Sequence, residues 1–253
     1  MGSKHKVFFT NITLVTLLLI RYFSEAVFAK ISDERIFTLA RFVNLTIVFT
    51  LIMLVLWANI YKLHELNIDK TALWVLIFSA GLLAFRYVPY FFGILIVGGI
   101  AILLYSLYKN NIHYHKSELL SLQSLLLTLC ISIPLAPVLY NLYAGEKNSL
   151  TFTKVEQAVT DLNFFGVLFE EFLFRGLIWM FLKNRGMSER NLIVIQGILF
   201  WLAHYYSTSG FWYSIWVCIP FVSILLGLLV YRTKSITASL LAHSYYNFLV
   251  GLL

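Results

Sequence analysis

Long apolar runs separated by short polar stretches occur along the whole chain. A helix that crosses a lipid bilayer needs about 20 predominantly apolar residues. Runs close to this length lie at 7–28, 38–60, 71–88, 90–108, 118–142, 158–182, 191–206, 211–231 and 236–252. The pattern predicts an all-α fold, a polytopic bundle of nine transmembrane helices, or eight spans if 71–108 forms one broken hairpin.

The composition supports the membrane class. Of the 253 residues, 60% are hydrophobic and 12% are charged, whereas about 25% of the residues in an ordinary soluble domain are charged. A soluble fold of this size cannot bury so much apolar surface. The net charge of +7 comes from basic residues scattered between apolar runs, as the positive-inside rule expects. We therefore expect the lipid bilayer as a partner and no nucleic acid.

The basic residues also predict an orientation, because Lys and Arg are enriched in short cytoplasmic loops. If the N-terminus is inside, the inner side holds Lys4, Lys6, Lys62, Lys70, Lys109, Lys116, Lys183, Arg185, Arg190, Arg232 and Lys234. The outer side then holds Arg21, Lys30, Arg35, Arg41, Arg86, Lys147 and Lys154. This excess predicts a cytoplasmic N-terminus. No repeat or linker divides the chain, so 1–253 is expected to form a single integral membrane domain.

Ionisable side chains inside apolar runs are costly in a membrane and are usually functional. Glu170, Glu171 and Arg175 lie within the run 158–182. Glu171 and Arg175 are four residues apart, so they share a helix face and can form an ion pair. Glu170 points about 100° away from Glu171 and is not neutralised by that pair. A purely structural Glu–Arg clamp is the alternative, although packing alone hardly explains two adjacent carboxylates.

Two later runs also carry polar side chains. His204 ends the sequence Phe200-Trp201-Leu202-Ala203-His204, and His243 precedes Asn247 by four residues, so the latter two share a helix face. A single buried histidine is more often a satisfied core residue than a ligand. These residues therefore gain meaning only if they lie near the two carboxylates.

The depth of these residues in the bilayer connects them. With a rise of 1.5 Å per residue, Glu170 and His204 lie about 20 and 21 Å from the basic loop 183–190. His243 and Asn247 lie roughly 14 and 20 Å from the next basic loop on the same side. Independent structural residues would not need to agree in depth. The agreement predicts one polar site buried between the later helices.

The chain resembles the CPBP family, which holds the type II CAAX prenyl proteases and the bacteriocin-processing or bacteriocin-immunity (Abi) proteins. Three motifs carry the resemblance, in order and within apolar runs: Glu170-Glu171-x-x-x-Arg175, Phe200-x-x-x-His204 and His243-x-x-x-Asn247. It implies a catalytic core at 158–253, preceded by variable membrane spans over 1–150.

The resemblance also implies an activity, that of an intramembrane endopeptidase that cleaves a membrane-associated peptide or protein. Glu170 and His204 would activate a water molecule, and His243 and Asn247 would stabilise the oxyanion. The Glu–Arg pair of the first motif would hold the geometry or gate the cavity. The short lysine-rich loops and the likeness to bacteriocin-related proteins favour a bacterial plasma membrane.

The need for a cofactor stays open at the level of sequence. Glu170, His204 and His243 could bind zinc and leave an open coordination position. The same groups could also act as a glutamate-dependent protease without a metal ion, and no HExxH motif favours zinc.

Two other functions are compatible with the sequence. One is a non-proteolytic immunity or regulatory scaffold, although a pure scaffold has no need for buried ionisable groups. The other is a transporter or channel that uses the same residues as a proton relay. The absence of a repeat between the two halves of the chain weakens the second.

Overall fold

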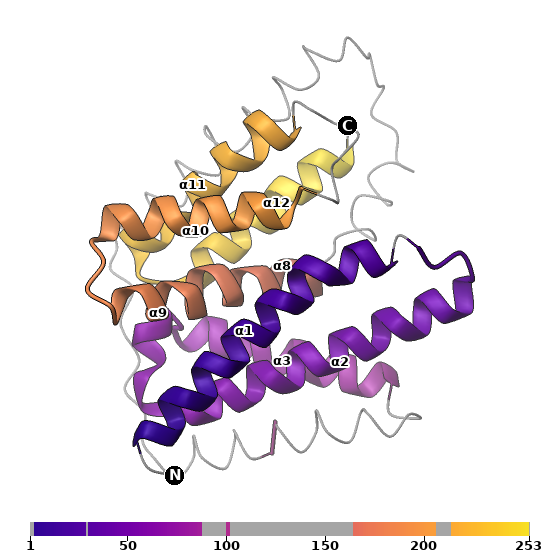
Figure 1. Ribbon diagram of the computed structural model, residues 1–253, viewed down its shortest axis with the longest axis horizontal. Helices are drawn as coiled ribbons and strands as arrows, with labels where there is room; N and C mark the ends of the chain where they lie inside the picture. Colours follow the sequence, from indigo (N-terminus) through magenta and orange to yellow (C-terminus); the bar gives the residue numbers. More distant parts are fainter. Residues whose placement is uncertain (1–2, 29, 88–99, 102–163, 206–213, 253) are drawn as a thin grey trace.

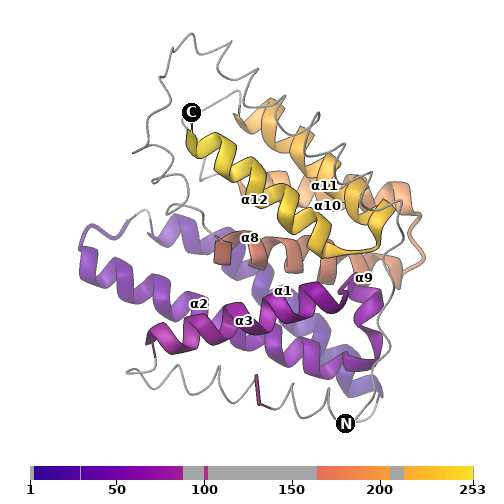
Figure 2. The same cartoon turned by 180° about the vertical axis from the view of Figure 1, so that it is seen from behind.

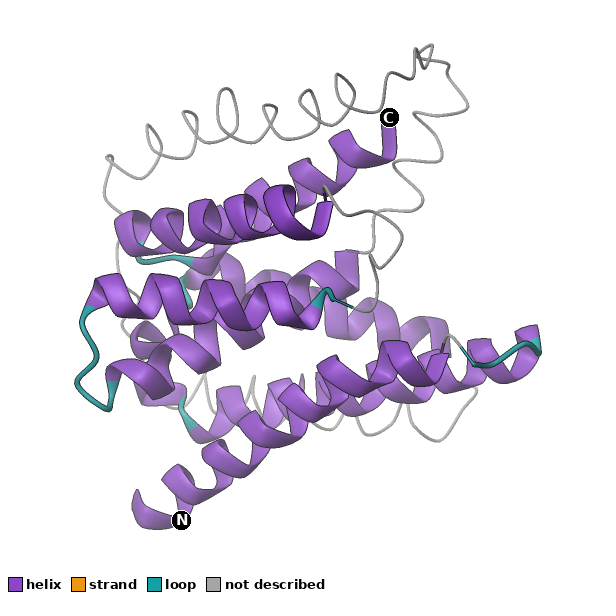
Figure 3. Cartoon of the chain, turned by 45° about the horizontal axis from the view of Figure 1, so that its top comes forward, coloured by secondary structure: helices purple, strands orange, loops and turns teal. Residues whose placement is uncertain are grey.

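The computed structural model describes residues 3–28, 30–87, 100–101, 164–205 and 214–252 (Figure 1). Every regular element in these ranges is helical (Figure 3). In chain order the elements are α1 (Ser3–Phe28), α2 (Glu34–Ala58), η1 (Ile60–Leu66), α3 (Lys70–Tyr87), α8 (Phe164–Glu170), η3 (Glu171–Ile178), α9 (Trp179–Lys183), α10 (Glu189–Ala203), η4 (Ser214–Cys218), α11 (Ile219–Thr233) and α12 (Ile236–Leu252). The predicted all-α fold is confirmed for these residues.

Two of the described helices are long and apolar enough to cross a membrane, Glu34–Ala58 and Ile215–Thr233. Shorter apolar helices occupy Phe8–Ser24 and Lys70–Leu82. The runs predicted at 90–108 and 118–142 lie almost entirely outside the described residues. The number of spans therefore stays a prediction, whereas the two apolar helices agree with a membrane bundle.

The outward faces of the helices carry large apolar side chains. Phe8, Phe23 and Phe78 are each more than 60% exposed, and Leu241 on α12 is half exposed. A soluble protein rarely exposes so many large apolar groups on several helices. Lipid tails are the solvent that matches such a surface.

The segment formed by α8, η3 and α9 runs through the middle of the bundle. In two opposite views it lies between α10–α12 and α1–α3 (Figures 1 and 2). η3 makes direct contacts with α1, α10 and α12. Side chains that project from η3 in different directions therefore meet helices from both ends of the chain.

Local capping explains where two of the helices begin. The side chain of Asp33 accepts hydrogen bonds from the backbone N–H groups of Arg35 and Ile36 at the start of α2. Ser188 accepts one from Asn191 N–H at the start of α10. Each cap satisfies backbone donors that the first helical turn leaves unpaired.

Several connections meet at one end of the bundle. Asp69 accepts hydrogen bonds from the hydroxyl groups of Ser235 and Thr237, which links the start of α3 to the start of α12. Lys234 pairs with Glu189 at 3.3 Å, so the turns before α10 and α12 are also adjacent. These turns belong to the basic loops that the sequence assigns to one side of the membrane.

Candidate active site

The middle segment differs from the regular helix predicted at 158–182. α8 ends at Glu170, and the backbone then forms the π-helix η3 from Glu171 to Ile178 before α9 continues. The side-chain amide of Asn67 donates to the carbonyl of Arg175 at 2.9 Å. The backbone at Gly176 packs closely against η1, since a Cβ on this glycine would lie 3.4 Å from the carbonyl oxygen of Leu66. π-Helical turns are uncommon and often occur at functional sites.

Glu171 is fully buried, and two donors converge on one oxygen of its carboxylate. Arg175 Nη1 donates to Oε1 at 3.0 Å, which confirms the predicted i, i+4 ion pair. His243 Nδ1 lies 2.8 Å from the same oxygen and donates to it from α12. Arg175 also reaches the carbonyl of Ser223 at 3.4 Å, and its guanidinium carbon lies 4.3 Å from the centre of the Phe200 ring. This cluster therefore ties η3 to α10, α11 and α12.

Glu170, the preceding residue, faces a different set of groups. Its carboxylate oxygen Oε1 lies 2.8 Å from Arg21 Nη2 and 3.6 Å from His204 Nε2. The second oxygen, Oε2, lies 3.9 Å from His243 Nε2. The Glu170 side chain is 12% exposed, whereas that of Glu171 is 0% exposed. Three helices other than its own thus direct polar atoms at Glu170.

The hydrogen bonds of His204 define its tautomer. Nδ1 lies 2.9 Å from the carbonyl oxygen of Phe200, and a carbonyl can only accept, so Nδ1 carries the proton. Arg21 Nη2 lies 3.2 Å from Nε2, and a guanidinium can only donate. His204 is therefore a neutral ring whose Nε2 lone pair faces Arg21 and Glu170.

Phe200 supports both histidines. Its ring centre lies 4.4 Å from that of His204 and 5.6 Å from that of His243. Phe174 packs edge-on against it at 5.2 Å. Packing from several sides restricts the rotamers of the histidines, which is a requirement for precise chemistry.

Of the six residues that the sequence singles out, five take part in these contacts. Glu170, Glu171, Arg175, His204 and His243 are joined by the hydrogen bonds and ion pairs described above. The sixth, Asn247, lies one turn after His243 on α12 and is partly buried. Within the described part of the chain, no hydrogen bond joins Asn247 to the other five.

Arg21 is the member of this site that the sequence interpretation missed. It was assigned to the outer loops, but it lies within α1 and is only 5% exposed. The ion pair with Glu170 is the physical reason, because a buried guanidinium needs a counter-charge. Arg21 therefore does not count toward the orientation of the chain. An arginine within the apolar run 7–28 was the signal that could have indicated it.

The positions of the site residues show whether they could bind a metal ion. Glu170, His204 and His243 approach one another closely enough to suggest shared coordination. Arg21, however, already donates toward the Glu170 carboxylate and the His204 Nε2 lone pair that a metal would use. Within the described ranges, no three His, Cys, Asp or Glu side chains are arranged to hold a metal. The residues in this arrangement do not fit a metal ion.

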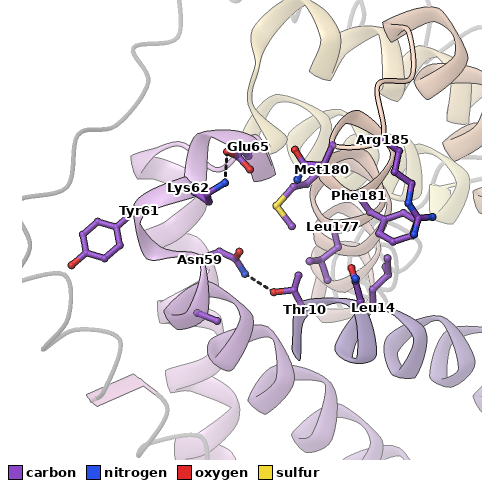
Figure 4. Close-up of a pocket in the computed structure, with 13 residues that line it drawn as sticks. Thr10, Leu14, Asn59, Tyr61, Lys62, Glu65, Leu177, Met180, Phe181 and Arg185 are labelled. Carbon is purple, nitrogen blue, oxygen red and sulfur yellow. Dashed lines mark hydrogen bonds and ion pairs between the residues drawn. The ribbon is translucent and has the colours of Figure 1, made fainter. Parts of the chain in front are cut away.

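The described residues also line a cavity of about 600 Å³ at the N-terminal end of α1 (Figure 4). Its walls include Thr10, Leu14, Asn59, Leu177, Phe181 and Arg185. Asn59 donates a hydrogen bond to Thr10 across it at 3.1 Å. None of the candidate catalytic residues lines this cavity, and Arg21 lies about 10 Å beyond Leu14 along α1. This cavity and the ionisable cluster are therefore separate features.

A helical bundle that buries carboxylates, histidines and arginines at its centre agrees with a protein that carries out polar chemistry within a membrane. Comparison with protein families assigns residues 158–249 more narrowly, to the type II CAAX prenyl endopeptidase Rce1-like family. This match agrees with the CPBP resemblance, and the family is integral to the membrane.

The match includes all six candidate residues but not Arg21. It supports an intramembrane protease at the level of the family. No curated protein and no solved structure matches the chain.

Proposed function

We propose that the protein is an intramembrane endopeptidase that cleaves a membrane-associated peptide or protein, with Glu170 as its general base. The observation that carries the proposal is the position of Glu170, whose two carboxylate oxygens face His204 Nε2 at 3.6 Å and His243 Nε2 at 3.9 Å. A base must lie within hydrogen-bond reach of the water that it deprotonates. A water molecule beside Glu170 would also be within reach of an imidazole.

The reaction would begin when Glu170 takes a proton from this water. The resulting hydroxide attacks the carbonyl carbon of the scissile peptide bond, and the carbonyl oxygen becomes an oxyanion. Collapse of the tetrahedral intermediate breaks the C–N bond, and the proton held by Glu170 passes to the departing amine. His204, held as the Nδ1–H tautomer by the Phe200 carbonyl and by Arg21, would form one wall of the position that this water occupies.

His243 and Asn247 would stabilise the oxyanion by hydrogen bonding. Glu171 already accepts from His243 Nδ1 at 2.8 Å. To donate from Nε2 as well, His243 must carry protons on both nitrogens. The carboxylates of Glu171 and Glu170 provide the negative charge that such an imidazolium needs. Preorganised donors of this kind are among the largest contributions to catalysis.

The basic turns at one end of the bundle support a cytoplasmic location for that end. These turns include 183–189 and the turn at Lys234, which the Lys234–Glu189 pair joins. The N-terminal half of α1 borders the same end, because Thr10 lines the cavity together with Arg185. A cytoplasmic N-terminus is therefore part of the proposal.

Terminus-resolved mass spectrometry tests the function without a guess about the substrate. Membrane and secreted peptides are compared between cells that carry the native chain and cells that carry Glu170→Gln at equal protein level. We expect a specific set of peptide termini to disappear in the variant. Glu189→Gln is the matched control, because Glu189 is 42% exposed and pairs with Lys234 far from the site. Identical peptide profiles, together with a phenotype on deletion, would instead support the scaffold function.

A further inference from the structure

Arg21 comes from the part of the chain that the family match does not cover, yet it lies at the centre of the site. Residues 158–249 match the family, whereas Arg21 belongs to α1, Ser3–Phe28. Its side chain is 5% exposed in the bundle. A guanidinium in such a position is costly unless it is paired and hydrogen-bonded. The groups that it pairs with therefore indicate why it is there.

One nitrogen of Arg21 contacts two of the groups that the proposed reaction uses. Nη2 lies 2.8 Å from Glu170 Oε1 and 3.2 Å from His204 Nε2. These two acceptors are themselves 3.6 Å apart. Two acceptors thus converge on the single NH₂ group of Nη2, which fixes the carboxylate relative to the imidazole. A planar guanidinium suits such fixed geometry better than a flexible ammonium group does.

The contact also determines which atoms remain for the reaction. Since Oε1 of Glu170 is held by Arg21, Oε2 is the oxygen that faces His243 Nε2. His204 is held as the neutral Nδ1–H tautomer by the Phe200 carbonyl on one side and by Arg21 on the other. Arg21 thereby orders both the base and its neighbouring ring.

No other described guanidinium makes these contacts. Arg175 is the second buried arginine, but it binds Glu171 at 3.0 Å and the carbonyl of Ser223 at 3.4 Å. Removal of Arg21 would leave Glu170 facing His204 and His243 without a hydrogen-bonded cation from the described residues. α1 therefore contributes something that the matched segment does not replace.

We propose that Arg21 is a positioning residue of the active site, which orients the Glu170 carboxylate and fixes the His204 tautomer, so that α1 completes the catalytic centre. This inference rests on the proposed function. It predicts that proteolysis needs the N-terminal helix, not only the matched segment.

The first experiment compares Arg21→Met, Arg21→Lys and Tyr22→Phe in full-length protein. Cleavage is followed at the termini that Glu170→Gln removes. We expect Arg21→Met to lower kcat about 100-fold through loss of orientation, with KM unchanged because a positioning residue acts through Glu170 and His204. Arg21→Lys should restore activity to within about 10-fold of the native rate, since it keeps the charge but not the planar fork.

Tyr22→Phe is the control for a merely structural role. The Tyr22 hydroxyl donates to the Leu199 carbonyl at 2.8 Å, so its removal also loosens α1 from α10 but leaves Glu170 and its partners intact. We expect its rate to stay within about threefold of the native rate, as an ordinary hydrogen bond contributes modestly. Equal losses in Tyr22→Phe and Arg21→Met would show that Arg21 only fastens the helix, and would overturn the inference.

A second readout needs no substrate. ¹⁵N NMR of histidine-labelled protein in detergent reports the tautomer of His204, with His204→Gln to assign its resonances. We expect the Nε2 resonance to shift in Arg21→Met, because Nε2 loses a charged donor, and to remain unchanged in Tyr22→Phe. If Arg21→Met does not accumulate, Arg21→Lys carries the same test, with a smaller shift expected.

The outcomes separate this inference from the proposed function. If Glu170→Gln removes the termini and Arg21→Met cleaves normally, the protease function stands and the inference is wrong. Faster cleavage by Arg21→Met would also overturn it, because the guanidinium would then obstruct the site. If Glu170→Gln changes no termini, the protease function fails, and an unchanged His204 resonance in Arg21→Met would reject the positioning role separately.

Discussion

The two adjacent carboxylates at the centre of the bundle have contrasting surroundings. Glu171 is completely buried, and it accepts hydrogen bonds from Arg175 at 3.0 Å and from His243 at 2.8 Å. Glu170 is 12% exposed, and its only contact shorter than 3 Å among the described residues is with Arg21. One oxygen of Glu171 is held by two donors, whereas Oε2 of Glu170 faces His243 Nε2 on α12 at the longer distance of 3.9 Å.

In the proposed mechanism, this difference separates a structural role from a reactive one. A fully buried carboxylate that is held by an arginine and a histidine holds elements together but has no access to a substrate. A carboxylate with partial exposure and neighbouring imidazoles can exchange a proton. The change from α-helix to π-helix between Glu170 and Glu171 accompanies this difference, and His243, which contacts both, connects the two environments.

The largest loss of stability is expected when the structural carboxylate loses its arginine. Arg175→Met leaves Glu171 buried without its ion-pair partner, and breaking such a pair costs about 3–5 kcal/mol. The free energy of unfolding in mixed detergent micelles measures the effect. Lys62→Met is the matched control, because the Lys62 side chain is 59% exposed in its pair with Glu65, and we expect a change within about 1 kcal/mol. Equal effects in both variants would contradict a structural role for the buried pair.

A smaller loss of stability, together with a loss of activity, is expected for His243→Gln, because His243 lies between the two carboxylates. Loss of a donor to the oxyanion lowers kcat about 10²–10³-fold, and loss of one of the two donors to Glu171 Oε1 costs about 1–3 kcal/mol of stability. Cleavage rates and unfolding are measured on the same preparation. His64→Gln is the control, since His64 is exposed on η1. A variant that loses stability but retains full activity would remove His243 from the mechanism.

Much of the structural carboxylate's environment could be predicted from the sequence. Glu171 and Arg175 are four residues apart, and that spacing alone places them side by side. The depth of His243 in its apolar run brought it to the same level. These predictions depend only on the repeat of a helix and the thickness of a bilayer, which tertiary packing does not change.

The partner of the reactive carboxylate could not be predicted in the same way. Arg21 and Glu170 are 149 positions apart, and no local spacing reveals which helices become neighbours. Arg21 follows Lys6 by 15 positions, which corresponds to about 22 Å and thus to the same depth as Glu170. The depth of Arg21 in the bilayer could therefore be predicted from the sequence. Its contact with Glu170 could not, because the contact between α1 and η3 depends on the packing of the whole bundle.

The π-helix also could not be predicted from the pattern of apolar residues. The apolar run 158–182 predicts a helix, and the described part of it is helical, but the run gives no sign that Glu171–Ile178 forms a π-helix. The side chain of Asn67, from the turn after η1, bonds the carbonyl of Arg175. Asn67 has a positive φ of 53°, a conformation that asparagine tolerates better than most residues. A contact between residues this far apart in sequence is a tertiary effect.

The central claim is that the two carboxylates have different roles, and the most direct test measures cleavage and unfolding for Glu170→Gln and Glu171→Gln side by side. We predict that Glu170→Gln abolishes cleavage, by about 10³-fold or more, and lowers the melting temperature less than Glu171→Gln does, because Glu170 is partly exposed and Arg21 is its one partner within 3 Å among the described residues. Glu171→Gln should lower the melting temperature, because it removes the charge that Arg175 and His243 require. Normal cleavage by Glu170→Gln, or indistinguishable behaviour of the two variants, would contradict the account.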